Sequence, residues 1–451
     1  MASIGAATAG KSMQDAFDAI SDNVTTEETK KDNMHTDNMP VDTPELTQHL
    51  NHHHHPNSSS AETISTTRDT SLAPLKLTSP TTPQEPPPPT NQPPNTFTGY
   101  LATSPTSPLT HAPFPPKAFL PTDIDIAITH CGLCFSDIST YRSSWSPTLY
   151  PICLGHEIIG TAIRIGASAR AGIRLGDRVG VGPQGYNCHL RSCQSCSSGR
   201  ENYCPVRVGT YGERYGDGSG VSQGGFADFT RQDSNSVFGI PEGLDSASAA
   251  VMLCAGATVF EPLKEHGAAT PGKRVGIVGL GGLGHLGVLF AKAMGCEYVV
   301  AVSRKEDKRE DAMKLGADGY IATADEEGWA ETHAASLDLI ICTVSGPGMP
   351  LMEYLGLLRP KGVFCQVGIP EGSLPQLDTM ALVLNGTSIC FSDSASPGNV
   401  REMLSLAAKK GVRAWTECRP MVEINSVIKE MEEGRARFRY VMVNEESEKE
   451  I

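Results

Sequence analysis

Short apolar runs separated by turn-forming residues fill the segment between residues 123 and 182. The runs "DIDIAITH", "IIGTAIRIG" and "DRVGVG" combine Ile, Val and Thr with Gly and Asp, and each is only a few residues long. β-Branched residues favour strands, whereas Gly and Asp favour the turns between them. This part of the chain is therefore predicted to form a β-rich domain of short strands.

The pattern changes from about residue 273 onward. Apolar runs typical of strands alternate with helical stretches in the order "RVGIVGL", "GHLGVLFAKAMG", "YVVAVS", "KREDAMKLGA", "LDLIICTV", "PLMEYLGLLRPKG" and "VFCQVGI". Strands that alternate with helices predict a parallel sheet with right-handed crossovers, which is a doubly wound, Rossmann-type α/β fold. After about residue 389 the chain offers one more helix, "NVREMLSLAAKKG", and the closing segment "RARFRYVMV".

Residues 1–95 show no such period. They contain runs such as "TSPTTPQEPPPPTNQPPN" and few large apolar side chains. Burial could not offset the entropy lost on ordering such a segment, so we predict a disordered tail. The rest of the chain is predicted to form a β-rich domain at 96–255, completed by 389–451, and a Rossmann domain at 256–388.

The composition argues against several classes of protein. The tail holds 12 acidic and 5 basic residues, and therefore half of the formal net charge of −14, while the remaining chain has no cluster of Lys and Arg that would bind nucleic acid. We find no uninterrupted apolar stretch of about 18 residues, the length that a membrane span needs. The first residues do not resemble a secretion signal, and the 13 cysteines are odd in number. We therefore expect reduced thiols in a cytoplasmic protein.

A glycine motif directly follows the first strand of the predicted parallel sheet. In "VGIVGLGGLGHLG", Gly279, Gly281 and Gly284 form G-x-G-x-x-G between an apolar strand and a helix. In that context the first Gly permits a tight turn, the second lets the backbone approach a pyrophosphate, and the third allows the helix to pack closely on the sheet. The alternative is a purely structural turn. The predicted cofactor-binding residues of this loop are Gly279, Gly281, Gly282, Leu283 and Gly284.

The second strand of the predicted sheet decides between the two nicotinamide cofactors. NAD is typically bound by an Asp or Glu at the end of this strand. The sequence instead has Ser303, Arg304 and Lys305 there, followed by Lys308. A missing carboxylate and added positive charge favour a 2′-phosphate, and therefore NADP. The alternative is a solvated helix start whose cations bind nothing.

Three dispersed motifs contain further metal-ligand residues. They are "HCGLCFSD" at 130–137, "LGHEIIG" at 154–160 and "MLCAGATVFEPL" at 252–263. Each alone is weak evidence, because single Cys and His residues are common in protein cores. Together they offer two thiolates and an imidazole, a set that suits a tetrahedral zinc with one open position.

These motifs, in this order and followed by "GIVGLGGLGHLG", resemble the zinc-dependent medium-chain alcohol dehydrogenases, and in particular their cinnamyl-alcohol-dehydrogenase-like, NADP-linked branch. The resemblance covers residues 97–445 and implies that the β-rich part is a GroES-like catalytic domain. It implies that Cys134, His156 and Cys254 are the ligands of the catalytic zinc. Glu157 would be a neighbouring carboxylate that can approach the metal. Cys131 would not be a ligand.

The resemblance also assigns roles around the reacting groups. Ser136 lies where the family has the Thr or Ser that passes on the alcohol proton, and Asp137 would orient a metal ligand. Arg437 lies where such enzymes often place an Arg near the cofactor phosphates. Ser139 replaces a His that many members use for the later steps of proton transfer, so those steps stay open. Cys153, just before "LGHE", is assigned no role.

Four closely spaced cysteines lie in "CHLRSCQSCSSGRENYC". The family's structural zinc lobe typically has the spacing C-x2-C-x2-C-x7-C, which Cys193, Cys196 and Cys204 match. The first position does not match, because Leu190 stands there and Cys188 lies two residues earlier. Ligand gaps of two to four residues are usual in structural zinc sites, so we predict that all four cysteines bind a second zinc. A three-cysteine or metal-free lobe is the alternative.

The resemblance implies an enzyme that transfers hydride between NADP(H) and a primary alcohol or aldehyde, aromatic or aliphatic, with two zinc ions per chain. The expected partners are this small-molecule substrate and a second copy of the chain in a homodimer, with no nucleic acid or membrane. We keep four alternatives open: a zinc-independent reductase, an NAD-linked polyol dehydrogenase, a zinc-binding interaction protein with a non-catalytic Rossmann domain, and a protein that acts through its acidic, Pro-rich tail.

Overall fold

The computed structural model describes residues 96–170, 172–346, 348–370 and 372–444. The segment predicted to be a disordered tail, residues 1–95, lies outside the described residues. All described residues belong to one contact unit, Glu85–Ile451. The 13 cysteines all lie within the described ranges, and none of them forms a disulfide.

A seven-stranded sheet forms the core of the β-rich domain. Its central strand, β3, pairs with β5, β9 and β18, and the strand order is β10-β6-β5-β3-β18-β17. Alternate side chains of β3 are Ile124, Ile126 and Ile128, which are fully buried. The strands are β3 (Asp123–Gly132), β5 (Glu157–Ile165), β6 (Arg178–Val181), β9 (Phe229–Asp233), β10 (Val237–Gly239), β17 (Thr416–Pro420) and β18 (Arg439–Val443).

Smaller elements of this domain extend from that sheet. A three-stranded sheet has the order β2-β1-β4, and β7 pairs with β8. The strands are β1 (Phe97–Ala102), β2 (Thr110–Phe114), β4 (Ile152–Cys153), β7 (Gln184–Tyr186) and β8 (Val208–Gly209). The helices are α2 (Phe135–Tyr141), α3 (Gln194–Ser197), α12 (Ile424–Glu432) and the 3-10 turns η1 (Glu201–Tyr203), η2 (Ser234–Ser236) and η5 (Met421–Glu423).

The second domain contains a six-stranded sheet in the order β13-β12-β11-β14-β15-β16. Every neighbouring pair is parallel. With β11 as the first strand, this is the doubly wound order 3-2-1-4-5-6, so the predicted Rossmann fold is confirmed. The strands are β11 (Arg274–Val278), β12 (Tyr298–Ser303), β13 (Gly319–Ala322), β14 (Leu337–Cys342), β15 (Leu358–Gln366) and β16 (Ser388–Phe391).

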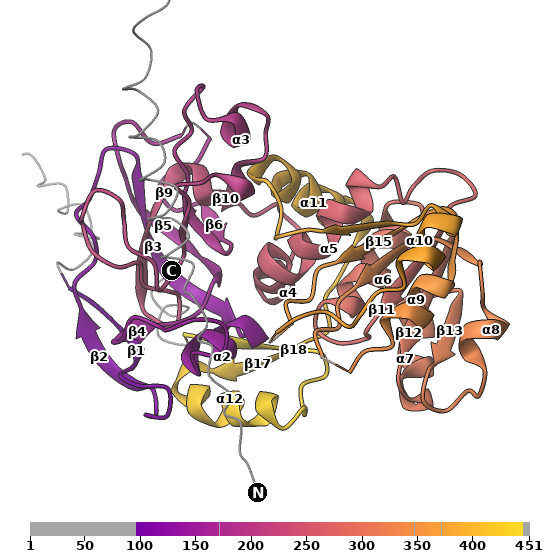
Figure 1. Cartoon of the computed structure of the whole chain (residues 1–451). Helices are drawn as coiled ribbons and strands as arrows, with labels where there is room; N and C mark the ends of the chain where they lie inside the picture. Colours follow the sequence, from indigo (N-terminus) through magenta and orange to yellow (C-terminus); the bar gives the residue numbers. More distant parts are fainter. Residues whose placement is uncertain (1–95, 171, 347, 371, 445–451) are drawn as a thin grey trace, which may run out of the picture. The chain divides into compact units, whose positions relative to one another are not determined.

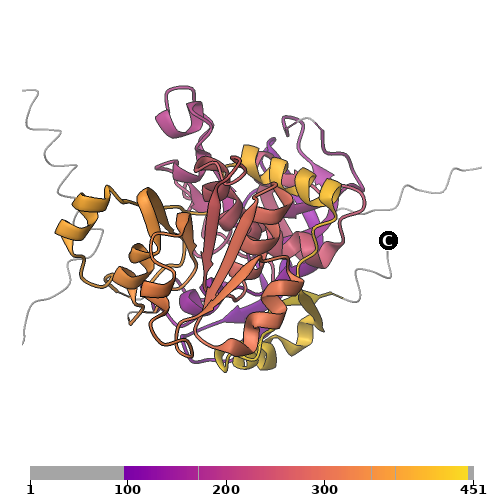
Figure 2. The same ribbon diagram turned by 90° about the vertical axis from the view of Figure 1, so that its right-hand side faces the viewer.

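Helices cover both faces of this parallel sheet, as Figure 1 and Figure 2 show. Apolar residues of α5, α6, α7 and α11 join one hydrophobic core with one face of the sheet. Residues of α8, α9 and α10 pack on the opposite face. The helices are α5 (Ala257–Glu265), α6 (Gly284–Ala293), η4 (Glu306–Lys308), α7 (Arg309–Lys314), α8 (Trp329–Thr332), α9 (Leu351–Gly356), α10 (Thr379–Asn385) and α11 (Pro397–Lys410).

The return of the chain from the Rossmann domain differs from the predicted boundary at residue 389. β16 ends at Phe391 and extends the parallel sheet, and α11 packs on α5 and α6. The chain rejoins the β-rich sheet only at β17, which begins at Thr416. The apolar face of α11, with Val400 and Met403, explains this difference, because it is buried in the Rossmann core. The sequence pattern did not predict β13 and β16, which are strands of only four residues each.

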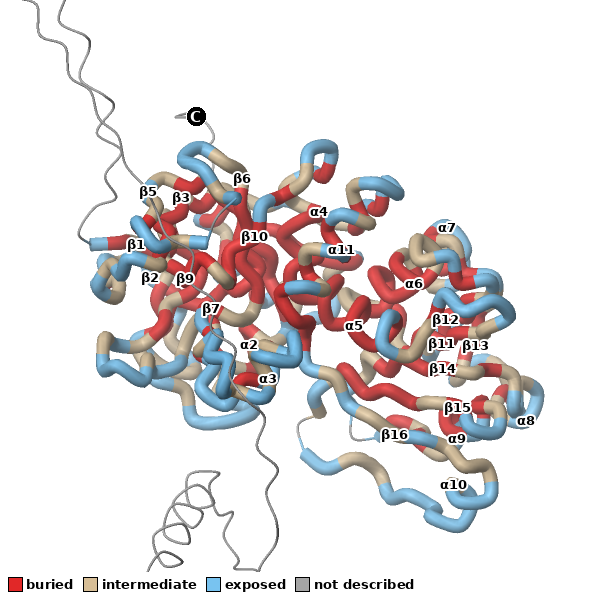
Figure 3. Tube along the Cα trace, turned by 90° about the horizontal axis from the view of Figure 1, so that it is seen from above, coloured by how far each residue is buried: buried red, intermediate tan, exposed pale blue. Residues whose placement is uncertain are grey.

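One helical stretch connects the two domains at the predicted boundary of 255/256. It runs from Ser246 to Glu265 through α4 (Ser246–Val251), the π-helical turn η3 (Met252–Gly256) and α5. Its α4 part contacts β3 and β5, whereas α5 contacts α6. Among the described residues it is the one helix long and apolar enough to cross a membrane, yet most of it is buried inside the protein, as in a core helix (Figure 3).

Candidate metal centres and cofactor site

Four buried ligand side chains meet between β3, β5 and η3. The sulfur atoms of Cys134 and Cys254, a ring nitrogen of His156 and a carboxylate oxygen of Glu157 all lie within 4.8 Å of one another. The structure thus brings together the three ligands and the carboxylate that the family resemblance implies, from three motifs spread over 121 residues of sequence. We call this group the inner cluster.

Backbone structure places each of these residues. Cys134 is the N-cap of α2, directly after β3, and its N–H donates to Asp137 Oδ2 at 2.8 Å. Glu157 is the first residue of β5. Cys254 lies in the π-helical turn η3. Such turns are rare inside α-helices and frequent at functional sites.

Asp137 orients the imidazole of His156. Its Oδ1 lies 2.9 Å from His156 Nδ1 and accepts a bond from the N–H of Gly155 at 3.1 Å. A carboxylate on one ring nitrogen fixes the ring and leaves the other nitrogen available as a ligand. His156 Nε2 lies 3.1 Å from Cys254 Sγ. Asp137 therefore occupies the orienting position that the sequence analysis expects.

The protonation of the inner cluster is strongly perturbed. A hydrogen bond with Cys254, together with the charge of Arg439, lowers the pKa of Cys134 well below that of a free thiol, and the same contact raises the pKa of Cys254. Burial favours the neutral form of His156, but Asp137 raises its pKa. Burial also raises the pKa of Glu157 to about 7, against the opposing charge of Arg439. The two thiols, the imidazole and the carboxylate therefore share few protons. A bound cation would displace the protons that remain.

Arg439 is a residue of this site that the sequence analysis missed. Its guanidinium is 2% exposed and pairs with Glu157 Oε1, and its Nη1 donates to Cys134 Sγ at 3.7 Å. Strand pairing brings the three together, because Val441 of β18 pairs with Gly132 of β3, which itself pairs with Glu157. A single Arg in "RARFRYVMV" gives no sign of this contact, because the register depends on three distant strands.

An unpaired atom in the inner cluster tests whether a metal fits there. Glu157 Oε2 is buried and has no hydrogen-bond partner among the described residues. Leaving a buried carboxylate oxygen unpaired costs free energy, and a cation at this point would remove that cost. The donor set of two thiols, one imidazole and one carboxylate is also the set that zinc prefers. The residues present therefore fit a zinc ion.

Ser136 and Tyr211 border the inner cluster. Ser136 is half-buried in the first turn of α2, and its Oγ lies 3.5 Å from His156 Nε2. Ser139, which replaces the relay histidine, is buried. The ring of Tyr211 lies 5.6 Å from that of His156, and burial followed by the charge of Asp137 raises its pKa. Tyr211 was not predicted, because an isolated Tyr in a loop carries no sequence signal.

Cys131, which lies within the first of the three motifs, and Cys153, which directly precedes the second, are packing residues. Cys131 is fully buried, lies outside the inner cluster, and has a pKa well above that of a free thiol because of burial. Cys153 Sγ contacts the carbonyl of Phe226 at 3.3 Å, and burial raises its pKa as well. Neither thiol is placed to act as a ligand, in agreement with the sequence analysis.

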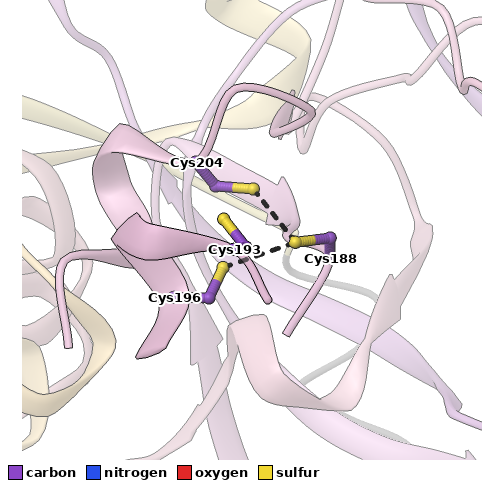
Figure 4. A group of neighbouring side chains, drawn as sticks. All are labelled: Cys188, Cys193, Cys196 and Cys204. Atoms are coloured by element: carbon purple, nitrogen blue, oxygen red, sulfur yellow. Dashed lines mark hydrogen bonds between the residues drawn. The ribbon is translucent and has the colours of Figure 1, made fainter. Parts of the chain in front are cut away.

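The four closely spaced cysteines between residues 188 and 204 form a separate cluster, which Figure 4 shows. The sulfur atoms of Cys188, Cys193, Cys196 and Cys204 lie within 4.8 Å of one another. Cys188 Sγ is 3.6 Å from Cys196 Sγ and 3.5 Å from Cys204 Sγ. Cys188 thus joins the group despite its shifted position. Leu190, at the usual ligand position, is 58% exposed.

This cysteine lobe contacts the segment that follows β16. Asn202 Nδ2 donates to the carbonyl of Asp393 at 3.0 Å, and Arg207 pairs with the Asp393 carboxylate at 2.7 Å. The hydroxyl of Tyr203 accepts a bond from the N–H of Asp393. Four thiols fill a tetrahedral coordination shell, so this cluster fits a closed, structural zinc. A metal here would hold a lobe that rests on the Rossmann domain.

The glycine loop has the geometry that its motif predicts. Gly279 has φ +92°, in the left-handed region that favours glycine. A Cβ on Gly284 would lie 1.8 Å from the carbonyl oxygen of Gly279, so only Gly allows α6 to approach β11 this closely. A Cβ on Gly281 would meet nothing within 4 Å. The loop is therefore open at the position where a pyrophosphate would approach the backbone.

Positive side chains gather beside this loop, at the carboxyl end of β12. Lys308 Nζ donates to the carbonyl of Leu280, between Gly279 and Gly281, at 2.8 Å. Burial lowers the pKa of Lys308, and the nearby charges of Arg437 and Arg304 lower it further. Arg437 itself pairs with Asp311 of α7, with Nε 3.0 Å from Oδ2.

The two remaining residues of this predicted set differ in exposure. Ser303 is half-buried at the end of β12. Lys305 is exposed, and its backbone carbonyl accepts a bond from Tyr320. Lys308 contacts the loop and is close enough to Arg304 and Arg437 for their charges to act on it, whereas Lys305 is the neighbour of Arg304 in the sequence.

Comparison with known proteins agrees with the geometry. The profile of the alcohol dehydrogenase GroES-like domain matches residues 120–242, and that of the zinc-binding dehydrogenases matches residues 282–409. The chain is 39% identical over 338 residues to NADP-dependent alcohol dehydrogenase 6 of Saccharomyces cerevisiae. The aligned region covers 74% of this chain and 92% of that protein. The chain therefore belongs to the zinc-binding, medium-chain alcohol dehydrogenases, in the branch of the cinnamyl alcohol dehydrogenases.

Solved structures show the same fold. A cinnamyl alcohol dehydrogenase from Sorghum bicolor superposes with a TM-score of 0.73 at 35% identity, covering 77% of this chain and 97% of that chain. A cinnamyl alcohol dehydrogenase from Helicobacter pylori, solved in complex with NADP(H), superposes with a TM-score of 0.70 at 29% identity, covering 77% and 98%. The doubly wound domain and the GroES-like domain are therefore both confirmed.

Proposed function

We propose that this alcohol dehydrogenase transfers hydride between NADP(H) and a primary alcohol or aldehyde at a zinc ion held by Cys134, His156 and Cys254. One observation supports this most strongly: Arg439 contacts both the metal-ligand cluster and the nucleotide loop. It pairs with Glu157, and a Cβ on Gly282 would lie 2.7 Å from its Cδ. The metal ligands and the cofactor loop are thus adjacent, as a hydride transfer requires.

The inner cluster divides the chemical tasks. When bound, zinc supplies a Lewis acid for the substrate oxygen and the nicotinamide supplies or accepts the hydride. Asp137 keeps His156 in one orientation, and Arg439 compensates the charge of Glu157. Glu157 Oε2 has no hydrogen-bond partner among the described residues, so it would be available as an additional oxygen ligand for a bound zinc.

Ser136 is the residue that handles the proton of the alcohol. Its hydroxyl is half-buried at the edge of the inner cluster, 3.5 Å from His156 Nε2. A hydroxyl can accept one proton while donating another, so it can pass a proton from a buried alcohol toward solvent. Ser139, in the sequence position of the missing relay histidine, is buried, and we propose that water continues the relay.

NADP(H) is favoured over NAD(H) by the charge beside the glycine loop. Arg304 and Lys305 directly follow β12, where an NAD-binding chain typically has a carboxylate. Arg437 and Lys308 add two further positive charges nearby. A 2′-phosphate carries negative charge that these cations would neutralise.

The proposal is tested by assaying zinc-loaded protein with a panel of aromatic and aliphatic aldehydes, using NADPH and NADH in parallel. We expect NADPH oxidation with several primary aldehydes and a lower kcat/KM with NADH. Absence of turnover across the panel would contradict the proposed reaction. A preference for NADH would contradict only the cofactor assignment, and turnover of polyols with NAD would favour a polyol dehydrogenase.

We also propose that the protein is a cytoplasmic homodimer. Among the described residues, the edge strand β16 pairs only with β15, and Phe391 at its end is 64% exposed. The neighbouring helix α10 exposes Met380, Val383 and Leu384. Exposed apolar side chains beside a free sheet edge favour association with a second copy. Light scattering of the purified protein tests the dimer, and fractionation of cells that express it tests the location.

A further inference from the structure

A third group of metal-ligand side chains lies in the Rossmann domain, apart from the two clusters described above. His266, Cys365 and Cys390 place their donor atoms within 4.8 Å of one another. His266 Nε2 lies 3.3 Å from Cys390 Sγ. None of the three belongs to the motifs on which the proposed reaction depends. We call this group the sheet-edge cluster, because Cys390 lies in the edge strand β16.

The backbone holds these three side chains in place. Cys365 and Cys390 are direct partners in the parallel pairing of β15 and β16, so their side chains point to the same face of the sheet. His266 ends α5 on that face, and its N–H donates to the carbonyl of Pro262 at 3.0 Å. Lys273 donates to the carbonyl of His266. The three donors therefore converge without any rearrangement of the chain.

The chemistry of the donors selects the class of ligand. Two thiols and an imidazole are soft donors that suit zinc and related transition metals, whereas Mg²⁺ and Ca²⁺ prefer oxygen. Cys365 is buried, but Cys390 and His266 are only half-buried, so a cation can reach the group from solvent. The negative charge of Glu265 acts on all three side chains, while the charge of Lys273 opposes it at His266.

We propose that His266, Cys365 and Cys390 form a third metal site, which binds one Zn²⁺ per chain and leaves one tetrahedral position to solvent. This site is independent of the proposed reaction, since its ligands are separate from the inner cluster and the cysteine lobe. The competing explanation is a packed pair of thiols beside a histidine, which would bind no metal and could be oxidised to a disulfide.

Metal content measured on the full chain tests this site. Wild-type protein, Cys390→Ser, His266→Gln and the control Cys296→Ser are saturated with zinc, desalted, and analysed by elemental mass spectrometry. Cys296 is a buried cysteine of the same domain that bonds only to backbone carbonyls among the described contacts. We expect the wild type and the control to retain one zinc per chain more than the other two variants. Because the readout is a difference, it does not depend on occupancy of the other two clusters.

A second measurement on the wild type keeps the proposal testable even if the variants fold poorly. Bound zinc should shield Cys390 from alkylation by iodoacetamide, and removal of zinc with a chelator should expose it, as followed by peptide mass spectrometry. Equal zinc content in all four proteins would overturn the proposal. Alkylation of Cys390 that is unaffected by zinc, or a Cys365–Cys390 disulfide in zinc-saturated protein, would overturn it as well.

Discussion

Asp137 Oδ1 and His156 Nδ1 lie 2.9 Å apart, and the same carboxylate caps α2 through the N–H of Cys134. One acidic side chain thus fixes two ligands of the inner cluster, one through its backbone and one through its ring. The sequence "CFSD" places the cap three residues after the thiol, which is the spacing that an N-terminal helical turn requires.

Replacing Asp137 with Asn should therefore weaken zinc binding. Asn has one carbonyl oxygen in place of two carboxylate oxygens, and its NH2 group can only donate. The side chain can therefore no longer accept hydrogen bonds from the backbone donors on one side and His156 on the other. We expect zinc affinity to fall about 10- to 100-fold, the usual cost of losing such a supporting contact. Chelator competition measures this affinity. Asp217→Asn, on an exposed loop, is the control, and equal affinities in the two variants would show that Asp137 does not position a ligand.

The buried pair of Arg439 and Glu157 should be important for stability. Arg439→Met removes one partner and leaves a buried carboxylate without its counter-charge, which typically costs about 3–5 kcal/mol. We expect a corresponding fall in the free energy of unfolding, measured with urea, and partial recovery in the double variant Arg439→Met/Glu157→Gln. Arg435→Met, which removes an exposed ion pair with Glu433, should cost less than about 1 kcal/mol. Similar losses in both Arg variants would contradict the assigned role.

Arg304 should contribute to the preference for NADP(H). In the proposed function Arg304 contacts the 2′-phosphate, and Arg304→Ala would then remove a charge-assisted contact worth roughly 1.5–3 kcal/mol. We expect the KM for NADPH to rise about tenfold or more, while the KM for NADH changes little. Lys314→Ala is a suitable control, because Lys314 lies on α7 and pairs with Glu310 instead. An equal rise in both KM values would show that Arg304 does not recognise the phosphate.

Buried His285 should make stability depend on pH. Burial lowers its pKa from 6.5 to about 4. Its Nδ1 lies 3.2 Å from the carbonyl oxygen of Gly281, and its Nε2 accepts a hydrogen bond from the N–H of Trp415. Because the unfolded chain binds more protons between these values, the stability that neutral His285 provides is complete above pH 6.5 and is lost as pH falls toward 4. We expect the wild type to lose about 2 kcal/mol more than His285→Gln between pH 7 and pH 5.

Urea unfolding at the two pH values measures this loss. An identical pH dependence in wild type and His285→Gln would contradict the role assigned to burial of the ring.

Much of the fold could be predicted from sequence because its signals are local. The glycine loop and the strands around it are recognisable within a few residues, and the structure confirms the left-handed turn at Gly279 and the close approach of α6 to β11 at Gly284. The candidate metal ligands were identified through family motifs, since spacing alone could not predict that Cys134 and Cys254 lie together.

Other features depend on contacts that no local pattern reveals. Arg439 reaches Glu157 only through the register of β18, β3 and β5. Cys365 and Cys390 become neighbours only when β16 joins the sheet, and that strand is too short for its pattern to be detected. The domain boundary was misplaced for the same reason, because α11 shows an apolar face but not which core buries it.

The most direct test of the proposed function compares zinc-loaded wild type with Cys134→Ser and Cys131→Ser in NADPH-dependent reduction of an aldehyde that the wild type turns over. Cys131 is the matched control, since it lies in the same motif but outside the inner cluster. The proposal predicts that Cys134→Ser loses the activity and most of the zinc of the inner cluster, while Cys131→Ser retains both. Wild-type turnover in Cys134→Ser would contradict it.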